Sequence, residues 1–281
     1  MEQIELALPA SPTYSTRNGS SLIYRYYPAQ SESAMILIHG ISEDSKYLYP
    51  LAEFVSSNNL AKVYTPDLRG YGENPARRGD VDYIGQTEDD LADFVQQIRK
   101  DQAISKIIIA GHSAGGGTAI RFMTGKYSDL ADACLLLAPH LGPGAPTERP
   151  SDGTIIVDMK RMIGLYLLNA LGIRRWNGLT VLKVDRPEEL RHGSETLEMS
   201  YRLMMSRTLL KYKQGLRKLT KPAFVLVGEN DEVFYADQYE PVFSTYTKIK
   251  VEQISNETHD GILSNIETHK LVREWLTSLT I

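Results

Sequence analysis

The sequence predicts an α/β protein with a mostly parallel central sheet, an antiparallel hairpin at the N-terminal end and an inserted helical cap. Two observations support this fold class. Short apolar runs of strand length alternate with amphipathic helical segments along most of the chain, and this alternation stops between residues 140 and 220. The 281 residues, 42% of them hydrophobic, are enough to bury a large core without disulfide bonds.

The first predicted element is a β-hairpin. Two strand-like runs, residues 13–17 and 22–27, flank Asn18-Gly19. This dipeptide is the strongest short signal for a β-hairpin.

Alternating strands and helices follow the hairpin. Apolar side chains at helical spacing predict helices at residues 47–58, 87–100, 114–124 and 266–279, the second with Thr87 as its N-cap. Short apolar runs predict strands at residues 34–38, 62–66, 106–110, 133–138, 223–228 and 249–254. Strands that alternate with helices in this way are typical of βαβ units, so these strands should be parallel.

The interruption predicts an inserted cap. It opens with the Pro- and Gly-rich segment 141–146 and then shows helical runs at 159–173 and 195–210, without a convincing strand. We therefore expect an α/β core from residues 1–139 and 220–281, and a helical cap, or lid, from residues 140–219.

Composition excludes several classes of protein. With 31 basic and 35 acidic residues the net charge is −4, which does not fit a nucleic-acid binder. No apolar run approaches the 18 or so residues of a membrane span. Residues 1–10 lack the features of a signal peptide, and the single cysteine, Cys134, excludes an internal disulfide. A cytoplasmic location is expected.

Ser113 is the predicted nucleophile. It lies at the centre of Gly111-His-Ser-Ala-Gly115, a G-x-S-x-G pattern with a strand directly before it and a helix directly after it. This order exposes the serine hydroxyl on a sharp turn at the carboxyl edge of the sheet, and the flanking glycines leave room for the backbone. The alternative interpretation is an ordinary Gly-rich turn between a strand and a helix, so the prediction depends on finding a base and an acid for the serine.

The predicted base and acid follow in the order that this architecture uses. His259 lies between the last strand and the last helix, and Asp231 lies in the loop after the strand at 223–228, so both should reach the edge that carries Ser113. His112 is expected to point away into the scaffold. The alternative acids are Asp260, Glu229 and Glu232, and His140 is the alternative base.

An oxyanion hole needs two backbone N–H donors. Ala114, directly after the nucleophile, should provide one. Ile41, in the loop after the strand at 34–38, should provide the other, because Gly40 allows the turn that presents it.

These motifs together resemble the α/β-hydrolase fold, and within it the monoacylglycerol lipase and lysophospholipase group, which includes serine aminopeptidase-like members. The resemblance spans residues 34–279, with the cap loosely matched, and is carried by His39-Gly40, Asp67-Leu-Arg-Gly-Tyr-Gly72, Gly111-His-Ser-Ala-Gly115, Gly228-Glu-Asn-Asp231 and His259. The sequence departs from the family pattern at two points. Ile41 and Ser42 follow His39-Gly40, where the family often has glycine or another small residue, and Ala114 follows the serine, where the family usually has methionine. The resemblance implies an ester-cleaving serine hydrolase with a mobile cap.

The expected function is therefore hydrolysis of carboxylic esters, of lipid-like or small acyl substrates, through an acyl-enzyme. Expected substrate contacts are His39, Gly40, His140 and Met204, the last from a Leu- and Met-rich stripe of the cap. An aminopeptidase or amidase with the same triad, or a catalytically silent binding module, remains an alternative. No metal or cofactor motif is present, and a homodimer is left open.

Overall fold

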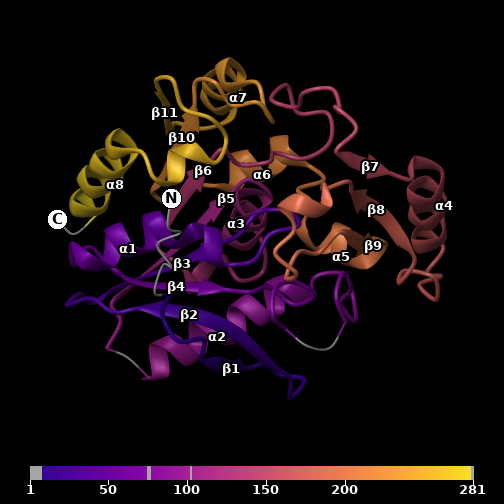
Figure 1. Ribbon diagram of the computed structural model, residues 1–281, viewed down its shortest axis with the longest axis horizontal. Coiled ribbons are helices and arrows are strands. Elements are labelled where there is room, and N and C mark those ends of the chain that lie inside the picture. The colour runs from indigo at the N-terminus through magenta and orange to yellow at the C-terminus, as the bar shows by residue number, and fades with distance from the viewer. Residues whose placement is uncertain (1–7, 75–76, 102, 280–281) are drawn as a thin grey trace.

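An eight-stranded sheet forms the centre of the computed structural model, which describes residues 8–74, 77–101 and 103–279 (Figure 1). Most of the segment considered for a signal peptide, residues 1–7, lies outside them. In spatial order the strands are β1 (Thr13–Ser15), β2 (Ser21–Tyr27), β4 (Lys62–Pro66), β3 (Ser33–Ile38), β5 (Lys106–His112), β6 (Ala133–Leu137), β10 (Ala223–Gly228) and β11 (Lys250–Ile254). The pairs β1–β2 and β2–β4 are antiparallel and all others are parallel. The predicted sheet and its N-terminal hairpin are confirmed.

Helices cover both faces of the central strands. Every residue of β6, and every residue but the first of β3 and of β5, is buried, and successive side chains of a strand point to opposite faces. The covering helices are α1 (Tyr49–Ser57), α2 (Gln86–Asp101), α3 (Ala114–Thr124), α7 (Tyr239–Tyr246) and α8 (Ile266–Ser278). In the described parts of the chain, no helix combines the length and the apolar character that crossing a bilayer requires.

Helix α7 was not predicted. Its only proline, Pro241, reads as a helix breaker in the sequence. In the structure this proline lies in the first turn of the helix. Backbone N–H groups in the first turn have no acceptor within the helix, so a proline there costs no helical hydrogen bond.

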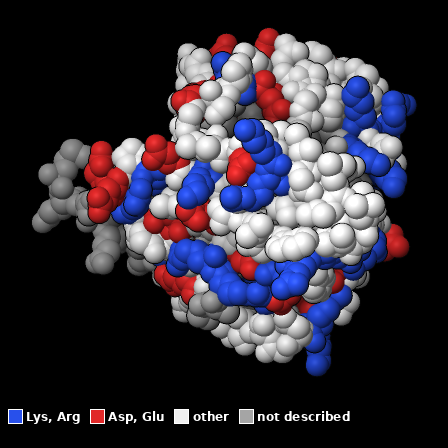
Figure 2. All heavy atoms as spheres, turned by 90° about the vertical axis from the view of Figure 1, so that its right-hand side faces the viewer, with Lys and Arg blue, Asp and Glu red and all other residues white. Residues whose placement is uncertain are grey.

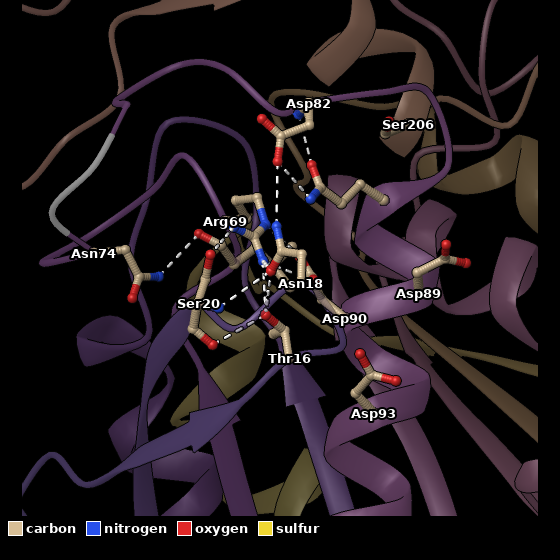
Figure 3. A network of polar contacts seen from close by, with 12 residues as sticks. Thr16, Asn18, Ser20, Arg69, Asn74, Asp82, Asp89, Asp90, Asp93 and Ser206 are labelled. Atoms are coloured by element: carbon tan, nitrogen blue, oxygen red, sulfur yellow. Dashed lines mark hydrogen bonds and ion pairs between the residues drawn. The ribbon is translucent and has the colours of Figure 1, made fainter.

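A polar network around Arg69 holds the N-terminal hairpin against the core (Figure 3). The guanidinium donates to the hydroxyls of Thr16 and Ser20 in the hairpin and pairs with Asp90 of α2 at 2.7 Å. Because its partners come from the hairpin and from α2, and Arg69 itself lies in the loop after β4, this one side chain links three segments.

The inserted segment is not wholly helical, which corrects the sequence prediction. It contains a three-stranded antiparallel sheet, in the order β7 (Ile155–Val157), β8 (Thr180–Val184) and β9 (Glu198–Ser200), together with α4 (Met159–Ala170), α5 (Tyr201–Arg207) and α6 (Tyr212–Lys218). The strands have only three to five residues, too few to show alternation. The second predicted helix starts later than expected because Ser200 caps it, its hydroxyl accepting from the Leu203 N–H.

The cap divides into an inner and an outer part. Met199, Leu203 and Leu216 belong to the main hydrophobic core, so β9, α5 and α6 form the inner part. The outer part, with α4 at the right of Figure 1, packs on α5 through a second, small apolar cluster, in which Leu165 of α4 and Val181 of β8 meet Tyr201 and Met205 of α5. Leu165 is the only buried residue of α4.

Backbone hydrogen bonds hold the inner part in place. The Thr196 N–H donates to Ser42 O, and the Ser200 N–H donates to Gly79 O. Arg202 adds an ion pair with Asp80. If the cap moves, as the resemblance implies, its outer part is the part with few such ties.

Candidate active site

Ser113 occupies a strained turn between β5 and α3. Its backbone dihedral angles are φ 54° and ψ −122°, a conformation that an L-residue avoids unless its surroundings impose it. The surroundings leave no space for side chains at the two glycines of the pattern. A Cβ on Gly111 would lie 2.3 Å from the carbonyl of Gly115, and a Cβ on Gly115 would lie 2.1 Å from Ile38 O. The G-x-S-x-G pattern is thus a steric requirement of this turn.

The predicted oxyanion loop lies beside the serine. A Cβ built on Gly40 would be 3.4 Å from Cβ of Ser113. The Gly40 N–H donates to the Tyr47 hydroxyl at 2.7 Å, whereas the N–H groups of Ile41 and Ala114 have no protein acceptor within the described residues. Two unused donors flanking a serine are what an oxyanion hole requires.

Asp231 and His259 are in direct contact, as predicted. His259 Nδ1 donates to Asp231 Oδ2 at 2.8 Å, and the other carboxylate oxygen accepts from the N–H groups of Val233 and Phe234. Because Nδ1 carries the proton, Nε2 of the neutral ring has a free lone pair and can act as a base. No hydrogen bond joins the Ser113 hydroxyl to His259 in the described structure, and such bonds are often long before a substrate binds.

The sequence interpretation missed the residues that hold His259. The backbone N–H of His259 donates to Glu232 Oε2 at 3.0 Å, and the backbone carbonyl oxygen of His259 lies 3.0 Å from His112 Nε2. The ring of Phe234 meets the imidazole edge-on, with 5.3 Å between centroids. Glu232 was considered as an acid, but nothing in the sequence indicates that it binds a backbone group.

His112 has a defined role in this scaffold, and its side chain reaches the site rather than pointing away from it. The carbonyl of His259 can only accept, so His112 Nε2 carries the proton and Nδ1 accepts from the Tyr47 hydroxyl at 3.0 Å. Burial lowers the pKa of His112 well below its usual value, which keeps the ring neutral. His112 and Tyr47 therefore connect Gly40 of the oxyanion loop to His259.

His39 does not fit the predicted substrate contact. It is fully buried, with Nδ1 bonded to Gly40 O and Nε2 accepting from the Leu68 N–H. Burial, and after it the charge of Arg207, lowers the pKa of His39 to about 3. The structure instead gives this residue a part in shaping the loop that carries Ile41.

Of the two remaining predicted contacts, only His140 is shown beside the nucleophile. His140 is half-buried, and its ring stacks on Phe234. The backbone N–H of His140 donates to the backbone carbonyl of Ser113 at 2.9 Å. Met204, on α5, is partly buried and packs against both apolar clusters. Cys134 is buried in β6, and burial raises the pKa of its thiol.

His112, His259 and Asp260 form a group whose side-chain ligand atoms lie within 4.8 Å of one another. One nitrogen of each histidine already donates to an oxygen, His112 to the main chain and His259 to Asp231. The donor set therefore fits a hydrogen-bonding role.

The doubly wound sheet, the serine on its strained turn and the Asp231–His259 pair define the class of this protein as an α/β-hydrolase. A family model described as serine aminopeptidase, S33, matches residues 29–261. The chain belongs to this hydrolase family.

Individual relatives are distant. Methylesterase 18 of Arabidopsis thaliana is 30% identical over 114 residues, which are 41% of this chain and 42% of the plant protein. Human monoglyceride lipase is 24% identical over 224 residues, covering 77% of this chain and 71% of the human one. A solved structure of a monoacylglycerol lipase from Paleococcus ferrophilus superposes with a TM-score of 0.70 at 20% identity, covering 92% of this chain and 99% of that one. The chain thus spans less than half of the plant relative, and the structural likeness confirms the fold.

Proposed function

We propose that this protein hydrolyses carboxylic esters through an acyl-enzyme on Ser113. His259 Nε2 takes the hydroxyl proton as Oγ attacks the ester carbonyl carbon, and Asp231 stabilises the imidazolium that forms. The resulting oxyanion accepts from the N–H groups of Ile41 and Ala114. The tetrahedral intermediate collapses, the alcohol leaves with the proton from His259, and a water activated by the same ring then hydrolyses the acyl-enzyme. The strained turn at Ser113, next to the Ala114 N–H and beside the loop that carries the Ile41 N–H, is the observation that carries this proposal.

The substrate class is proposed from the exposed face of the cap. On and beside α4, a set of large apolar side chains is between 40% and 75% exposed: Ile156, Met159, Ile163, Tyr166, Leu167, Leu171, Ile173, Trp176 and Leu179. Isolated exposed apolar residues are common, but a group concentrated on one helix, the strand before it and the loop after it indicates a surface that contacts something apolar.

Basic side chains border this apolar face. Lys160, Arg161, Arg174 and Arg175 are exposed within the same segment, and Figure 2 shows Lys and Arg around uncharged surface on the side that carries the cap. A groove of about 330 Å³ beside α4, lined by Leu165, Leu168 and Trp176 among others, continues the apolar surface. Apolar and basic groups together suit a lipid surface with anionic headgroups, which supports a lipid-like ester substrate.

Four glutamates of the inserted segment could bind the free amine of an aminopeptidase substrate; Glu188 and Glu189 are exposed, whereas the other two are committed elsewhere. Glu195 accepts from the N–H groups of His192 and Gly193, and Glu198 pairs with Lys183 at 2.7 Å. This favours ester substrates over aminoacyl ones.

The nucleophile is tested with a fluorophosphonate probe. Wild-type protein should be labelled once and Ser113→Ala not at all, while labelling that survives this change would refute the assignment. The Ser113→Ala, His259→Ala double variant should be little slower than either single variant, because members of one relay are not additive. Near-normal turnover in His259→Ala would move the role of base to His140.

The substrate class is tested with p-nitrophenyl esters of graded chain length beside aminoacyl arylamides. Each buried CH₂ contributes about 0.8 kcal/mol, or close to a fourfold gain in kcat/KM, so kcat/KM should rise over several carbons and then level off. A flat profile with aminoacyl substrates preferred would refute the lipid-like class and favour the peptidase alternative. No turnover of either kind would favour a silent binding module.

A further inference from the structure

Arg207 is a buried cation without an acidic partner. It is the last residue of α5, is 6% exposed, and forms no ion pair with any carboxylate in the part of the chain that the structure describes. Burying an unpaired guanidinium is costly unless other groups replace its hydration. Here the ring of Tyr71 lies under it, with 4.7 Å from Cζ to the ring centroid, and three oxygens accept its N–H groups.

Two of these oxygens belong to the loop that leads into the predicted oxyanion donor. Nη2 donates to His39 O at 2.6 Å, and Nη1 donates to Gly40 O at 3.2 Å. The two terminal nitrogens of the guanidinium therefore donate to two successive backbone carbonyls. A planar guanidinium can do this with both nitrogens at once, whereas the single ammonium of a lysine cannot.

The third oxygen connects Arg207 to the other side of the hole. Nε donates to Thr118 Oγ1 at 3.3 Å, and this hydroxyl in turn donates to Ala114 O at 3.0 Å. A single side chain of the inserted segment thus contacts the Ile41 loop directly and the Ala114 turn through one hydroxyl.

The contact with Gly40 also has an electronic consequence. Gly40 C=O and Ile41 N–H are the two ends of one peptide group, and a cation that accepts electron density from the oxygen polarises the group. The N–H at the other end becomes a stronger donor, since hydrogen bonds in a chain strengthen one another. Wherever negative charge develops on a substrate oxygen, this effect is larger in the transition state than in the ground state.

We propose that Arg207 is a positioning residue of the oxyanion hole, which aims and polarises the Ile41 N–H through its bonds to the His39 and Gly40 carbonyls. This inference rests on the proposed hydrolysis at Ser113. It makes the junction between cap and core part of the catalytic apparatus.

Arg202 provides a matched control on the same helix. It is an arginine five residues earlier, and its partners are Asp80 and the Asp82 carbonyl, away from the oxyanion loop. Changes at Arg202 and Arg207 should weaken the attachment of α5 to a comparable extent, but only the second should change the hole.

The test compares Arg207→Met, Arg207→Lys and Arg202→Met with wild type on one ester, by kcat, KM, Tm and the inhibition constant of a boronic acid. The boronate forms a tetrahedral adduct with Ser113 and so reports on the hole itself. In Arg207→Met we expect kcat to fall about tenfold to a hundredfold with KM nearly unchanged, and boronate binding to weaken by a similar factor. Arg207→Lys, which keeps the charge but not the fork, should recover part of the loss, and Arg202→Met should keep wild-type kcat.

Wild-type kcat and boronate affinity in folded Arg207→Met would overturn the inference. Equal losses in Arg207→Met and Arg202→Met would also overturn it, because they would indicate a general effect of α5. If Arg207→Met does not fold, Arg207→Lys is the variant that tests the inference. Wild-type kcat and boronate affinity in Arg207→Lys would show that the planar guanidinium is not needed and would overturn the inference. An inactive wild type would instead refute the proposed function.

Discussion

Replacing Asp231 with asparagine should nearly abolish turnover while leaving the fold intact, because the structure determines which way the new amide points. One carboxylate oxygen accepts from the N–H groups of Val233 and Phe234, at 2.8 and 2.7 Å. Two donors facing one position require an oxygen there, so the NH₂ of asparagine must face His259. His259 Nδ1, 2.8 Å away, would then have to accept a hydrogen bond.

This reversal moves the imidazole proton to Nε2, and the ring loses the lone pair that takes the proton of Ser113. For a triad of this kind the loss of the correct tautomer costs about 10⁴ in kcat, or about 5.4 kcal/mol at the transition state. The loss of one charge-assisted hydrogen bond should lower the free energy of unfolding by only about 2 kcal/mol, since the shape of the side chain is kept.

The assay is kcat on the best ester substrate, with the His259 tautomer read from its imidazole nitrogen resonances and the fold from Tm. Glu229→Gln is the control, because it alters a carboxylate in the same loop whose one hydrogen bond within the described residues is to the Asn256 N–H. Its kcat should match wild type. Turnover of Asp231→Asn within tenfold of wild type, or an unchanged tautomer, would refute the argument and direct attention to Asp260 or Glu232.

Three further outcomes are expected. In Gly115→Ala the new Cβ meets Ile38 O, so β3 must shift; we expect a loss of about 3 kcal/mol of stability in urea unfolding and little fluorophosphonate labelling, and normal labelling would contradict this steric account. The pKa of His39 is about 3 in the fold against 6.5 in the unfolded chain, so the unfolded state binds more protons between these values. Stability should therefore fall as the pH decreases from about 6.5 to 3, by about 5 kcal/mol for this residue, and His39→Gln should show a shallower pH dependence of urea unfolding; equal slopes would count against it. Buried Cys134, with its raised thiol pKa, should resist alkylation in the native protein and react in urea, whereas rapid native labelling would show an exposed thiol.

The sequence by itself was sufficient for the parts that depend on local chemistry. Asn18-Gly19 predicted the hairpin because few other residues suit its turn, and the alternating runs predicted the parallel strands because a buried strand must be apolar on both faces. Ser113, Asp231 and His259 were predicted to share one edge because each follows a strand, and parallel strands bring their carboxyl ends to one edge. The structure then placed Asp231 against His259, as that argument requires.

The three-dimensional structure alone decided what depends on contacts between distant segments. The cap strands were missed because strands of three to five residues are too short to show a period, and their pairing is set by the partner strand. Glu232, Tyr47 and Arg207 carry no motif, since each acts by bonding a backbone group that lies 7 to 168 residues away in the chain. Any polar side chain can bind a backbone group, so only folding determines which one meets His259, Gly40 or the carbonyls of the oxyanion loop.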